Sequence, residues 1–304
     1  MHIQIVMATQ NGARFLREQL DSFVAQEHQD WSLLVSDDRS TDSTRDIVAE
    51  FAERVPQEVR LVDGPGKGPA ANFLFLLNHP NLGLFPTALS DQDDIWLPDK
   101  LSRFVAALGR DDDCEGPLLF SGATQIIDES GHLLTLFDTR PRTPSFWNAL
   151  VECIAGGNTM GLNREALRLV RRIGVKIDIP FHDWWLYHLI TGVGGRVVYD
   201  QVPLLLYRQH DDSYRGANQG WKSRVKRLRE FTSGDYRQWV RRNLAALKAI
   251  EAELTPEARA AILGLQSRGS LRWLRGGTDR ARVYRQKPLE TFIIRAALLC
   301  GFVI

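Results

Sequence analysis

The stretch Ile3-Gln4-Ile5-Val6-Met7-Ala8, followed at once by Thr9-Gln10-Asn11-Gly12, sets a pattern that recurs through the first third of the chain. A short apolar run that ends in a polar, glycine-containing segment is typical of a buried strand and the loop after it. Three more apolar runs end in the same way, and amphipathic helices are expected between them. This alternation predicts an α/β fold with a mostly parallel sheet flanked by helices. The strands are expected at 3–8, 31–36, 59–62 and 84–90, and the helices at 13–26, 43–53 and 69–77.

Each expected strand ends in a polar loop. The first is Thr9-Gln10-Asn11-Gly12, and the others cover residues 37–42, 63–68 and 91–94. The carboxyl ends of parallel strands lie along one edge of a sheet, and ligands of open α/β sheets bind there. We therefore expect the side chains of these loops to lie close together.

The fourth loop is the most informative, because Ser90-Asp91-Gln92-Asp93-Asp94-Ile95-Trp96-Leu97 brings three carboxylates together after a buried strand. Carboxylates this close repel one another, and a divalent metal with oxygen ligands would relieve that repulsion. A metal held by so few protein oxygens keeps room for phosphate. The motif favours a metal and nucleotide-diphosphate site over its alternative, a solvated acidic turn that caps the helix begun by Pro98.

Composition and charge limit the number of domains and the cellular compartment of the protein. The length of 304 residues allows about two domains, and we predict one at 1–216 and a second, basic and helical, at 217–304. Residues 1–216 carry 20 Lys and Arg against 30 Asp and Glu, a balance of −10, whereas 217–304 carry 18 against 7, a balance of +11. Cys114, Cys153 and Cys300 show no paired spacing, which fits a reducing compartment. No signal peptide is apparent, so we expect a cytoplasmic protein.

The C-terminal region contains six arginines and a lysine between 268 and 287, followed by the almost wholly apolar stretch 288–304. Basic side chains attract anionic headgroups, so 268–304 predicts peripheral attachment to the inner face of the cell membrane. A C-terminal helix that packs on the acidic body is an equal alternative. Nucleic acid is not an expected partner, because no stacking motif accompanies the charge.

The ordered motifs of residues 2–216 resemble the family 2 glycosyltransferases, which have the Rossmann-like GT-A fold and use nucleotide sugars. The resemblance rests on the loops described above together with Gly68-Pro69-Ala70-Ala71-Asn72-Phe73, His182-Asp183-Trp184-Trp185 and Tyr207-Arg208-Gln209-His210. The form Asp-Gln-Asp-Asp-Ile-Trp is especially similar to bacterial members that build surface polysaccharides, among them many rhamnosyltransferases.

The resemblance implies roles for the donor side of the site. Asp91 and Asp93 match an Asp-x-Asp signature, in which the second carboxylate coordinates Mn²⁺ or Mg²⁺ and the first meets the ribose or the metal. Asp38 matches the carboxylate that accepts the imide N–H of a pyrimidine base, and the alternative for its loop is a helix cap. Thr9 and Asn11 lie where the first loop meets the nucleoside.

Two further residues are candidates by their position. Lys67 and Asn72 lie on the third loop and the helix after it, so they suit contact with the nucleotide or its phosphates. A flexible turn with a solvated lysine is an equal alternative. Arg39 departs from the family pattern, because relatives carry glycine there. Its backbone must avoid positive φ or bear strain.

The resemblance also implies residues for the transfer step. Asp183 matches the catalytic base of inverting members, and the flanking Trp184 and Trp185 would desolvate its carboxylate or bind the acceptor sugar. Core packing is the commoner fate of such aromatics. His210 resembles a histidine that reaches the metal or the diphosphate in some relatives, with a structural role as the alternative.

The prediction is an inverting, metal-dependent glycosyltransferase. It would move a sugar from a dTDP- or UDP-sugar, dTDP-rhamnose among the candidates, to a hydroxyl of a lipid-linked or lipopolysaccharide, O-antigen-type glycan. Uracil and thymine present the same imide edge, so Asp38 does not distinguish the two nucleotides. A nucleotidyltransferase and a non-catalytic sugar-binding scaffold are the alternatives. A nucleotidyltransferase would have a glycine-rich basic loop after the first strand, and this chain lacks one. The presence of Asp93 and Asp183 argues against a non-catalytic scaffold.

Overall fold

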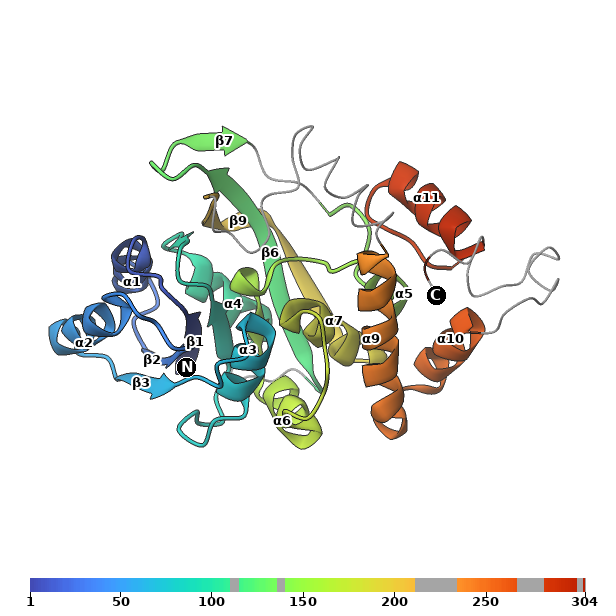
Figure 1. The fold of residues 1–304 in the computed structure, drawn as a ribbon, viewed down its shortest axis with the longest axis horizontal. Coiled ribbons are helices and arrows are strands. Elements are labelled where there is room, and N and C mark those ends of the chain that lie inside the picture. Colours follow the sequence, from blue (N-terminus) through green and yellow to red (C-terminus); the bar gives the residue numbers. More distant parts are fainter. Residues whose placement is uncertain (110–114, 136–139, 211–233, 267–281, 300–302, 304) are drawn as a thin grey trace. The chain divides into compact units, whose positions relative to one another are not determined.

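The computed structural model describes residues 1–109, 115–135, 140–210, 234–266, 282–299 and 303 (Figure 1). The chain divides into two compact units. The first contains 1–139, 155–176 and 196–214, and the second contains 140–154, 177–195 and 215–304. The region after 215 thus groups with two shorter segments from the middle of the chain, and a domain boundary at 216 stays a prediction. The described residues do not include Cys114, Cys300, residues 217–233 of the predicted helical region or residues 268–281 of the basic stretch.

The first four strands of the sheet are parallel, in the order β3-β2-β1-β4. They are β1 (Ile3–Thr9), β2 (Trp31–Asp37), β3 (Val59–Asp63) and β4 (Thr87–Ser90). Their ends are nearly in register, since Thr9 pairs with Asp37, Asp37 with Asp63, and Met7 with Ser90. The four predicted strands are confirmed, although the fourth begins at Thr87 and not at residue 84, and the polar loops that follow them start from one edge of the sheet.

Beyond β4 the sheet becomes mixed. It continues through β8 (Gly161–Leu162), β6 (Leu118–Ile127), β9 (Arg196–Arg208) and β5 (Ile95–Trp96), with β7 (Leu133–Thr135) paired to β6. Strand β8 is antiparallel to both of its neighbours, whereas β6 and β9 are parallel. The register of β9 shifts between Gly122 and Thr124 of β6.

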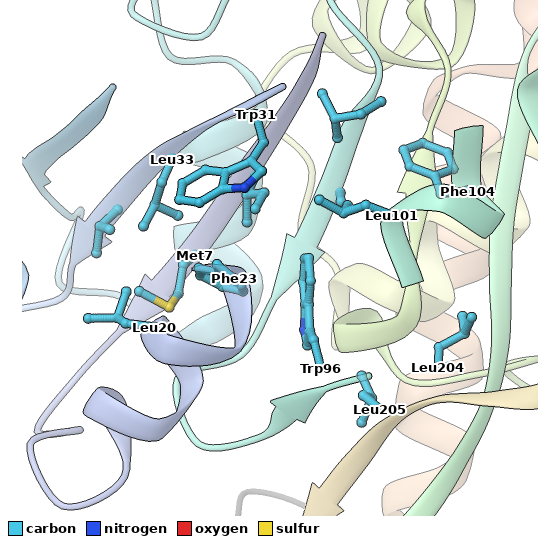
Figure 2. Packing of buried hydrophobic residues seen from close by; sticks show 14 of the residues in the cluster. Met7, Leu20, Phe23, Trp31, Leu33, Trp96, Leu101, Phe104, Leu204 and Leu205 are labelled. Carbon is cyan, nitrogen blue, oxygen red and sulfur yellow. The ribbon is translucent and has the colours of Figure 1, made fainter. Parts of the chain in front are cut away.

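The main core lies on one face of the parallel strands. Alternate residues of β1 and β2 pack there against α1 (Leu16–Val24), α2 (Thr44–Arg54) and α4 (Lys100–Leu108). Figure 2 shows Met7, Leu20, Phe23, Trp31 and Trp96 within this cluster. Helix α3 (Pro69–Leu77) contacts β1 and β2, and α6 (Arg164–Ile173) contacts α3. The strand period of two places the side chains of β1 and β2 alternately on opposite faces.

The described part of the second unit is helical. It contains α5 (Phe146–Ala149), α7 (His182–Gly192), α9 (Asp235–Ala249), α10 (Pro256–Gln266) and α11 (Pro288–Leu299) (Figure 1). Helix α7 contacts α5 and α9, and Thr255 N donates to Gly192 O at 2.9 Å. The predicted helical character of the C-terminal region is confirmed for these residues. None of the described helices combines the length and apolar character needed to cross a membrane.

Candidate active site

Gln92 joins the first and fourth strand-end loops. Its Oε1 accepts from Gln10 N at 2.8 Å, and its Nε2 donates to Gln10 O at 3.0 Å. A Cβ on Gly12 would lie 2.3 Å from the same Oε1 atom, so glycine is needed to admit the Gln92 side chain. The two loops therefore meet at the sheet edge, as the strand pattern predicted.

The second loop is joined to the first through Asn11. Ser40 Oγ accepts from Asn11 N at 2.8 Å, and Asn11 Oδ1 accepts from Thr41 N at 2.8 Å. The Thr9 hydroxyl is buried and donates to Asp37 Oδ1 at 3.2 Å. Thr9, the last residue of β1, and Asn11, in the loop after it, thus hold the first two loops together. Their contact with a nucleoside stays a prediction.

Asp38 holds the third loop in place. Its Oδ1 accepts from Gly66 N at 2.5 Å, and its Oδ2 accepts from Gly68 N at 2.8 Å. Both glycines have positive φ, 67° and 83°, which lets consecutive N–H groups of the loop turn toward the carboxylate. Lys67 lies between them and is exposed. A carboxylate can accept about four hydrogen bonds, so the predicted contact of Asp38 with a base is compatible with this clamp and stays a prediction.

Arg39 keeps the backbone conformation that glycine favours, with φ of 69°. This is the strained case of the two that the sequence allowed, and it costs about 1 kcal/mol relative to glycine. Its side chain lies against Gly66, where an added Cβ would be 2.3 Å from Arg39 Cζ. Arg39 and Asp38 therefore both contact the third loop.

Asn72 is buried and bonds to β2 through both ends of its amide. Ser36 Oγ donates to Asn72 Oδ1 at 2.5 Å, and Asn72 Nδ2 donates to Ser36 O at 3.0 Å. These bonds fix α3 against β2 just before the Asp37-Asp38 loop. They give Asn72 a structural role, and its predicted contact with the nucleotide stays a prediction.

Asp93 and His210 form the contact at the centre of the acidic loop. Asp93 Oδ2 lies 2.8 Å from His210 Nε2, and Phe15 packs 5.0 Å from the imidazole ring. Asp91 is partly buried. No group of three His, Cys, Asp or Glu side chains within the described ranges is arranged to hold a metal by itself. One or two carboxylates are nevertheless enough for Mg²⁺ when substrate phosphates complete its coordination, so the donor set here fits such an ion.

Asp94, which the sequence left without a role, lies behind this pair and is fully buried. Its Oδ2 accepts from Asn158 Nδ2 at 2.6 Å, and its Oδ1 accepts from Arg208 N at 3.3 Å. Burial, with added repulsion from Asp93 and Asp91, raises the pKa of Asp94 well above its usual value. Asp94 therefore supports the loop from inside the fold.

Lys100 and Asn158 complete the buried layer behind Asp94. Lys100 Nζ donates to Asn158 O at 2.6 Å and lies 3.3 Å from the centre of the Trp96 ring. Burial lowers the pKa of the Lys100 ammonium well below its usual value. Sequence reasoning missed Asn158, and the glycine-rich stretch 155–161 that contains it is the signal that could have pointed to it.

Arg208 sets the position of His210. Its buried guanidinium donates from Nε to Asp93 O at 3.1 Å and from Nη1 to Glu129 O at 2.9 Å. Nη2 pairs with Glu18 Oε2 at 2.7 Å. The end of β9 is thus tied to the acidic loop two residues before His210. Sequence reasoning quoted Arg208 within its motif but missed this role, because the three partners are distant in sequence.

Asp183 belongs to the second unit and lies in the first turn of α7. Its Oδ1 accepts from Trp184 N at 2.6 Å, and its side chain is partly buried. Trp184 and Trp185 are only 3% and 1% exposed, and Trp184 Nε1 donates to Ala149 O at 2.6 Å. The burial favours the packing alternative for both indoles, and their contact with an acceptor sugar stays a prediction.

Comparison with known proteins now fixes the family. The sequence pattern of the family described as Glycosyl transferase family 2 matches residues 4–167, which is more than half of the chain. The chain belongs to glycosyl transferase family 2. This glycosyltransferase is 29% identical over 254 residues to the dTDP-rhamnosyl transferase RfbG of Shigella flexneri, covering 79% of this chain and 84% of RfbG.

Two solved structures show the fold. The complex of S. aureus TarS residues 1–349 with UDP-GlcNAc has a TM-score of 0.60 at 14% identity, covering all of this chain and 82% of that one. The mannosyltransferase PcManGT from Pyrobaculum calidifontis, solved with GDP-Man and Mn²⁺, has a TM-score of 0.50 at 19% identity, covering 99% and 85%. The predicted GT-A fold and glycosyltransferase class are confirmed, which favours them over a nucleotidyltransferase or a non-catalytic scaffold.

The described part of the C-terminal region of this glycosyltransferase packs within its own unit. Gln286 N donates to Glu152 Oε2 at 2.8 Å, Asn148 Nδ2 donates to Tyr284 O at 2.9 Å, and Arg142 N donates to Gln286 Oε1 at 3.0 Å. Residues 282–299 thus follow the packing alternative on their inner side. Attachment to a membrane through 268–304 stays a prediction.

Proposed function

We propose that this family 2 glycosyltransferase is an inverting, metal-dependent enzyme. It transfers a sugar from a dTDP- or UDP-sugar to a hydroxyl of a lipid-linked or lipopolysaccharide, O-antigen-type glycan. The observation that carries the proposal is the 2.8 Å pair of Asp93 and His210 at the edge where the strand-end loops join. The similarity to RfbG makes dTDP-rhamnose the first donor to test, and UDP-GlcNAc in the TarS complex keeps UDP-sugars in the comparison.

The donor nucleotide occupies the joined loops of the first unit in this proposal. Asp38 accepts the imide N–H of the base, Thr9 and Asn11 line the nucleoside, and Lys67 meets the phosphates. Asn72 acts through α3, which it ties to β2. The hydrogen bonds that already join these loops support the proposal, because loops fixed before binding lose less conformational entropy when the donor enters.

Asp91 and Asp93, with His210, would hold Mn²⁺ or Mg²⁺. A divalent ion there supplies Lewis-acid stabilisation of the negative charge that develops on the departing diphosphate. The Mn²⁺ in the PcManGT structure supports a divalent ion for this fold. The buried layer of Asp94, Asn158 and Arg208 keeps the acidic loop in position when phosphate charge approaches it.

Asp183 is the proposed base of the transfer step. The acceptor oxygen forms a bond to the anomeric carbon while the bond from that carbon to the diphosphate oxygen breaks. The hydroxyl proton passes to the Asp183 carboxylate. A carboxylate is a sufficient base because the hydroxyl becomes much more acidic as the new bond forms. A single displacement of this kind inverts the anomeric configuration.

A donor screen tests the first half of the proposal. Melting temperatures are measured with dTDP, UDP and GDP, each with Mn²⁺, with Mg²⁺ and with a chelator. A nucleotide at a hundred times its Kd should raise the free energy of unfolding by about 2.7 kcal/mol. We expect dTDP or UDP to stabilise the enzyme only with metal. Equal stabilisation by GDP would contradict the assigned contact of Asp38 with a pyrimidine base. Stabilisation that persists with the chelator would contradict the metal dependence of donor binding.

The proposal places the enzyme peripherally at the cytoplasmic face of the cell membrane. A lipid-linked acceptor has its glycan at that surface, and the balance of +11 over residues 217–304 suits anionic headgroups. The charge pattern supports this location independently of the donor. Fractionation of cells that express the full chain, before and after a high-salt wash, tests it.

A further inference from the structure

Helix α11 turns an apolar face toward solvent. Leu289, Phe292 and Ile293 are 71%, 72% and 49% exposed. Their spacing of three and four residues places them on one side of the helix. Thr291, Ile294 and Leu298 on the other side are buried. The exposed side chains therefore form one continuous strip, named here the α11 strip.

The α11 strip differs from the outer face of its neighbour in the same unit. Helix α9 buries Val240, Leu244 and Leu247 and leaves Arg241 and Lys248 exposed. This is the usual arrangement of a surface helix. Helix α11 buries apolar residues on its inner side and exposes larger ones on its outer side. An exposed apolar strip of this kind marks a contact surface.

The inner side of α11 is firmly attached, so the strip is held outward. Thr291 Oγ1 accepts from Arg285 N at 2.9 Å, and Arg295 Nε donates to Val283 O at 2.9 Å. Gln286, just before the helix, contacts Glu152 through its backbone N–H. The first two bonds join α11 to residues 283–285, and the third ties the segment just before the helix to Glu152 of the same unit. The strip is thus presented by a fixed helix.

The charges beside the α11 strip favour an anionic partner. Lys287 is exposed directly before the helix. The acidic residue of the helix, Glu290, pairs with Arg285 at 3.4 Å. The surrounding sequence is strongly basic, at 18 Lys and Arg against 7 Asp and Glu over 217–304. Apolar side chains beside an exposed lysine, in a region of basic sequence, match the interfacial layer of a bilayer that contains anionic lipids.

The size of the strip also favours a lipid surface over a protein. An aromatic side chain offers roughly 150–250 Å² and an aliphatic one less, so these three, partly exposed, present at most about 350 Å². A stable protein interface buries about 800 Å² on each partner. We infer that α11 docks the enzyme on an anionic lipid bilayer by inserting Leu289, Phe292 and Ile293 between headgroups. This inference deepens the proposed peripheral location and rests on it.

Vesicle flotation of the full chain tests the inference. The probes are vesicles of phosphatidylcholine alone and vesicles that also contain phosphatidylglycerol, without donor or acceptor. We expect binding to the anionic vesicles, and we expect the triple variant L289S/F292S/I293S to weaken it at least about tenfold, since each loses several buried methylene equivalents. Leu263→Ser is the matched control, because Leu263 is 63% exposed on α10 of the same unit. It should bind as the wild type does.

Other outcomes would overturn the inference. Unchanged vesicle binding by the triple variant would show that α11 is not the docking element. Equal binding to both vesicle types would show that anionic lipid is not required. Self-association that the triple variant abolishes, measured by sedimentation without vesicles, would assign the strip to a second copy. A Phe292→Trp variant provides a readout that requires no loss of fold, because its emission should shift to the blue on anionic vesicles. Failure of the donor screen would leave this result standing, since vesicle binding uses no nucleotide.

Discussion

The strand-end loops of the first unit and the start of α7 in the second unit hold their candidate carboxylates in different ways. In the loops, partners far apart in sequence bond across the sheet edge, as in Gln10 with Gln92, Asp38 with Gly66, and Asp93 with His210. Asp183 instead stands on the first turn of a helix and, among the described residues, accepts its hydrogen bond from the adjacent Trp184 N.

This difference predicts which substitutions should affect neighbouring segments as well as the residue that is replaced. When a loop residue that is hydrogen-bonded to distant partners is replaced, the neighbouring loops should lose order too, because each bond fixes two segments. A residue on a helix whose buried face is secured by Trp184 and Trp185 can be changed without moving the helix. Substitutions at the helix start should therefore affect chemistry alone, and substitutions in the loops should affect binding, order and chemistry together.

The largest effect is expected for Asp183→Asn. Transfer should fall by about a thousandfold because the amide cannot take the hydroxyl proton. The thermal shift by donor and Mn²⁺ should stay at the wild-type value. Asp178→Asn is the control, since Asp178 is exposed on the same unit and forms a surface pair with Arg242 of little energetic weight. Normal transfer by Asp183→Asn would remove it as the base.

Asp93→Asn should lower transfer at least about a hundredfold, because charge on the leaving diphosphate loses its stabilisation. Unlike the change at Asp183, it should also abolish the dependence of donor binding on Mn²⁺. Transfer activity and metal-dependent donor binding, measured together, distinguish the role of the acidic loop from that of Asp183. Asp99→Asn serves as the control, because Asp99 is a partly exposed carboxylate that pairs with Arg103. Unchanged metal-dependent binding would show that Asp93 does not reach the ion.

The next effect is a pH dependence of the free energy of unfolding that arises from His188 on α7. His188 is buried, its ring Nδ1 contacts Trp184 O at 2.8 Å, and burial lowers its pKa from 6.5 to about 4. The unfolded chain therefore binds the proton first, and stability that is complete above pH 6.5 is lost as the pH falls toward 4. The loss should reach about 2 kcal/mol by pH 5.

Melting curves of the wild type and His188→Asn at pH 7.5 and pH 5 measure this effect. The asparagine amide does not titrate, so the variant should lose less stability on acidification than the wild type does. Equal losses in the two proteins would show that the imidazole is not held neutral by burial.

Asp38→Asn should loosen the third loop without unfolding the unit, because the amide can accept from only one of Gly66 N and Gly68 N. Trypsin cleavage after Lys67, followed by mass spectrometry, should become about tenfold faster, as expected for the loss of a charge-assisted hydrogen bond. Cleavage after the exposed Lys176 of the same unit gives the internal control. Faster cleavage at both sites would indicate general unfolding instead of a local clamp.

The smallest effect is expected for Arg39→Gly, which should raise the free energy of unfolding by about 1 kcal/mol by relieving the positive φ. Arg39→Ala keeps the Cβ and the strain while removing the contact with Gly66. Urea unfolding of the three proteins compares them. If glycine and alanine destabilise equally, the contact with the third loop outweighs the backbone strain.

The sequence predicted the parts whose cause is local. The strands β1 to β4 and the helix α3 follow from apolar runs, glycine-containing breaks and the Pro69 start, all read within a few residues. Strand β9 contains Asp200-Gln201-Val202-Pro203, which has the composition of a turn. In the structure the same residues lie where the register with β6 shifts. Local chemistry marked the irregularity, and pairing with β6 decided that the strand continues.

The candidate site divides in the same way. Asp91, Asp93, His210 and Asp183 were chosen from motifs, and the contact of Asp93 with His210 joins two of them. Asp94, Asn158, Lys100 and Arg208 form a buried layer that no motif explained. Their partners lie between 58 and 190 residues away in the chain. Such contacts depend on strand order, which periodicity does not encode.

By itself, the sequence of this protein determined the alternating strands and helices, the family resemblance and the residue types of a metal and diphosphate site. These features depend on short-range period and spacing, which each segment carries alone. Only the tertiary structure decided that Asp38 clamps the Gly66 and Gly68 backbone, that Asp94 is buried, and that α11 exposes an apolar strip. Burial and hydrogen bonding are properties of the packed chain, because they depend on which distant segment comes to lie against each side chain.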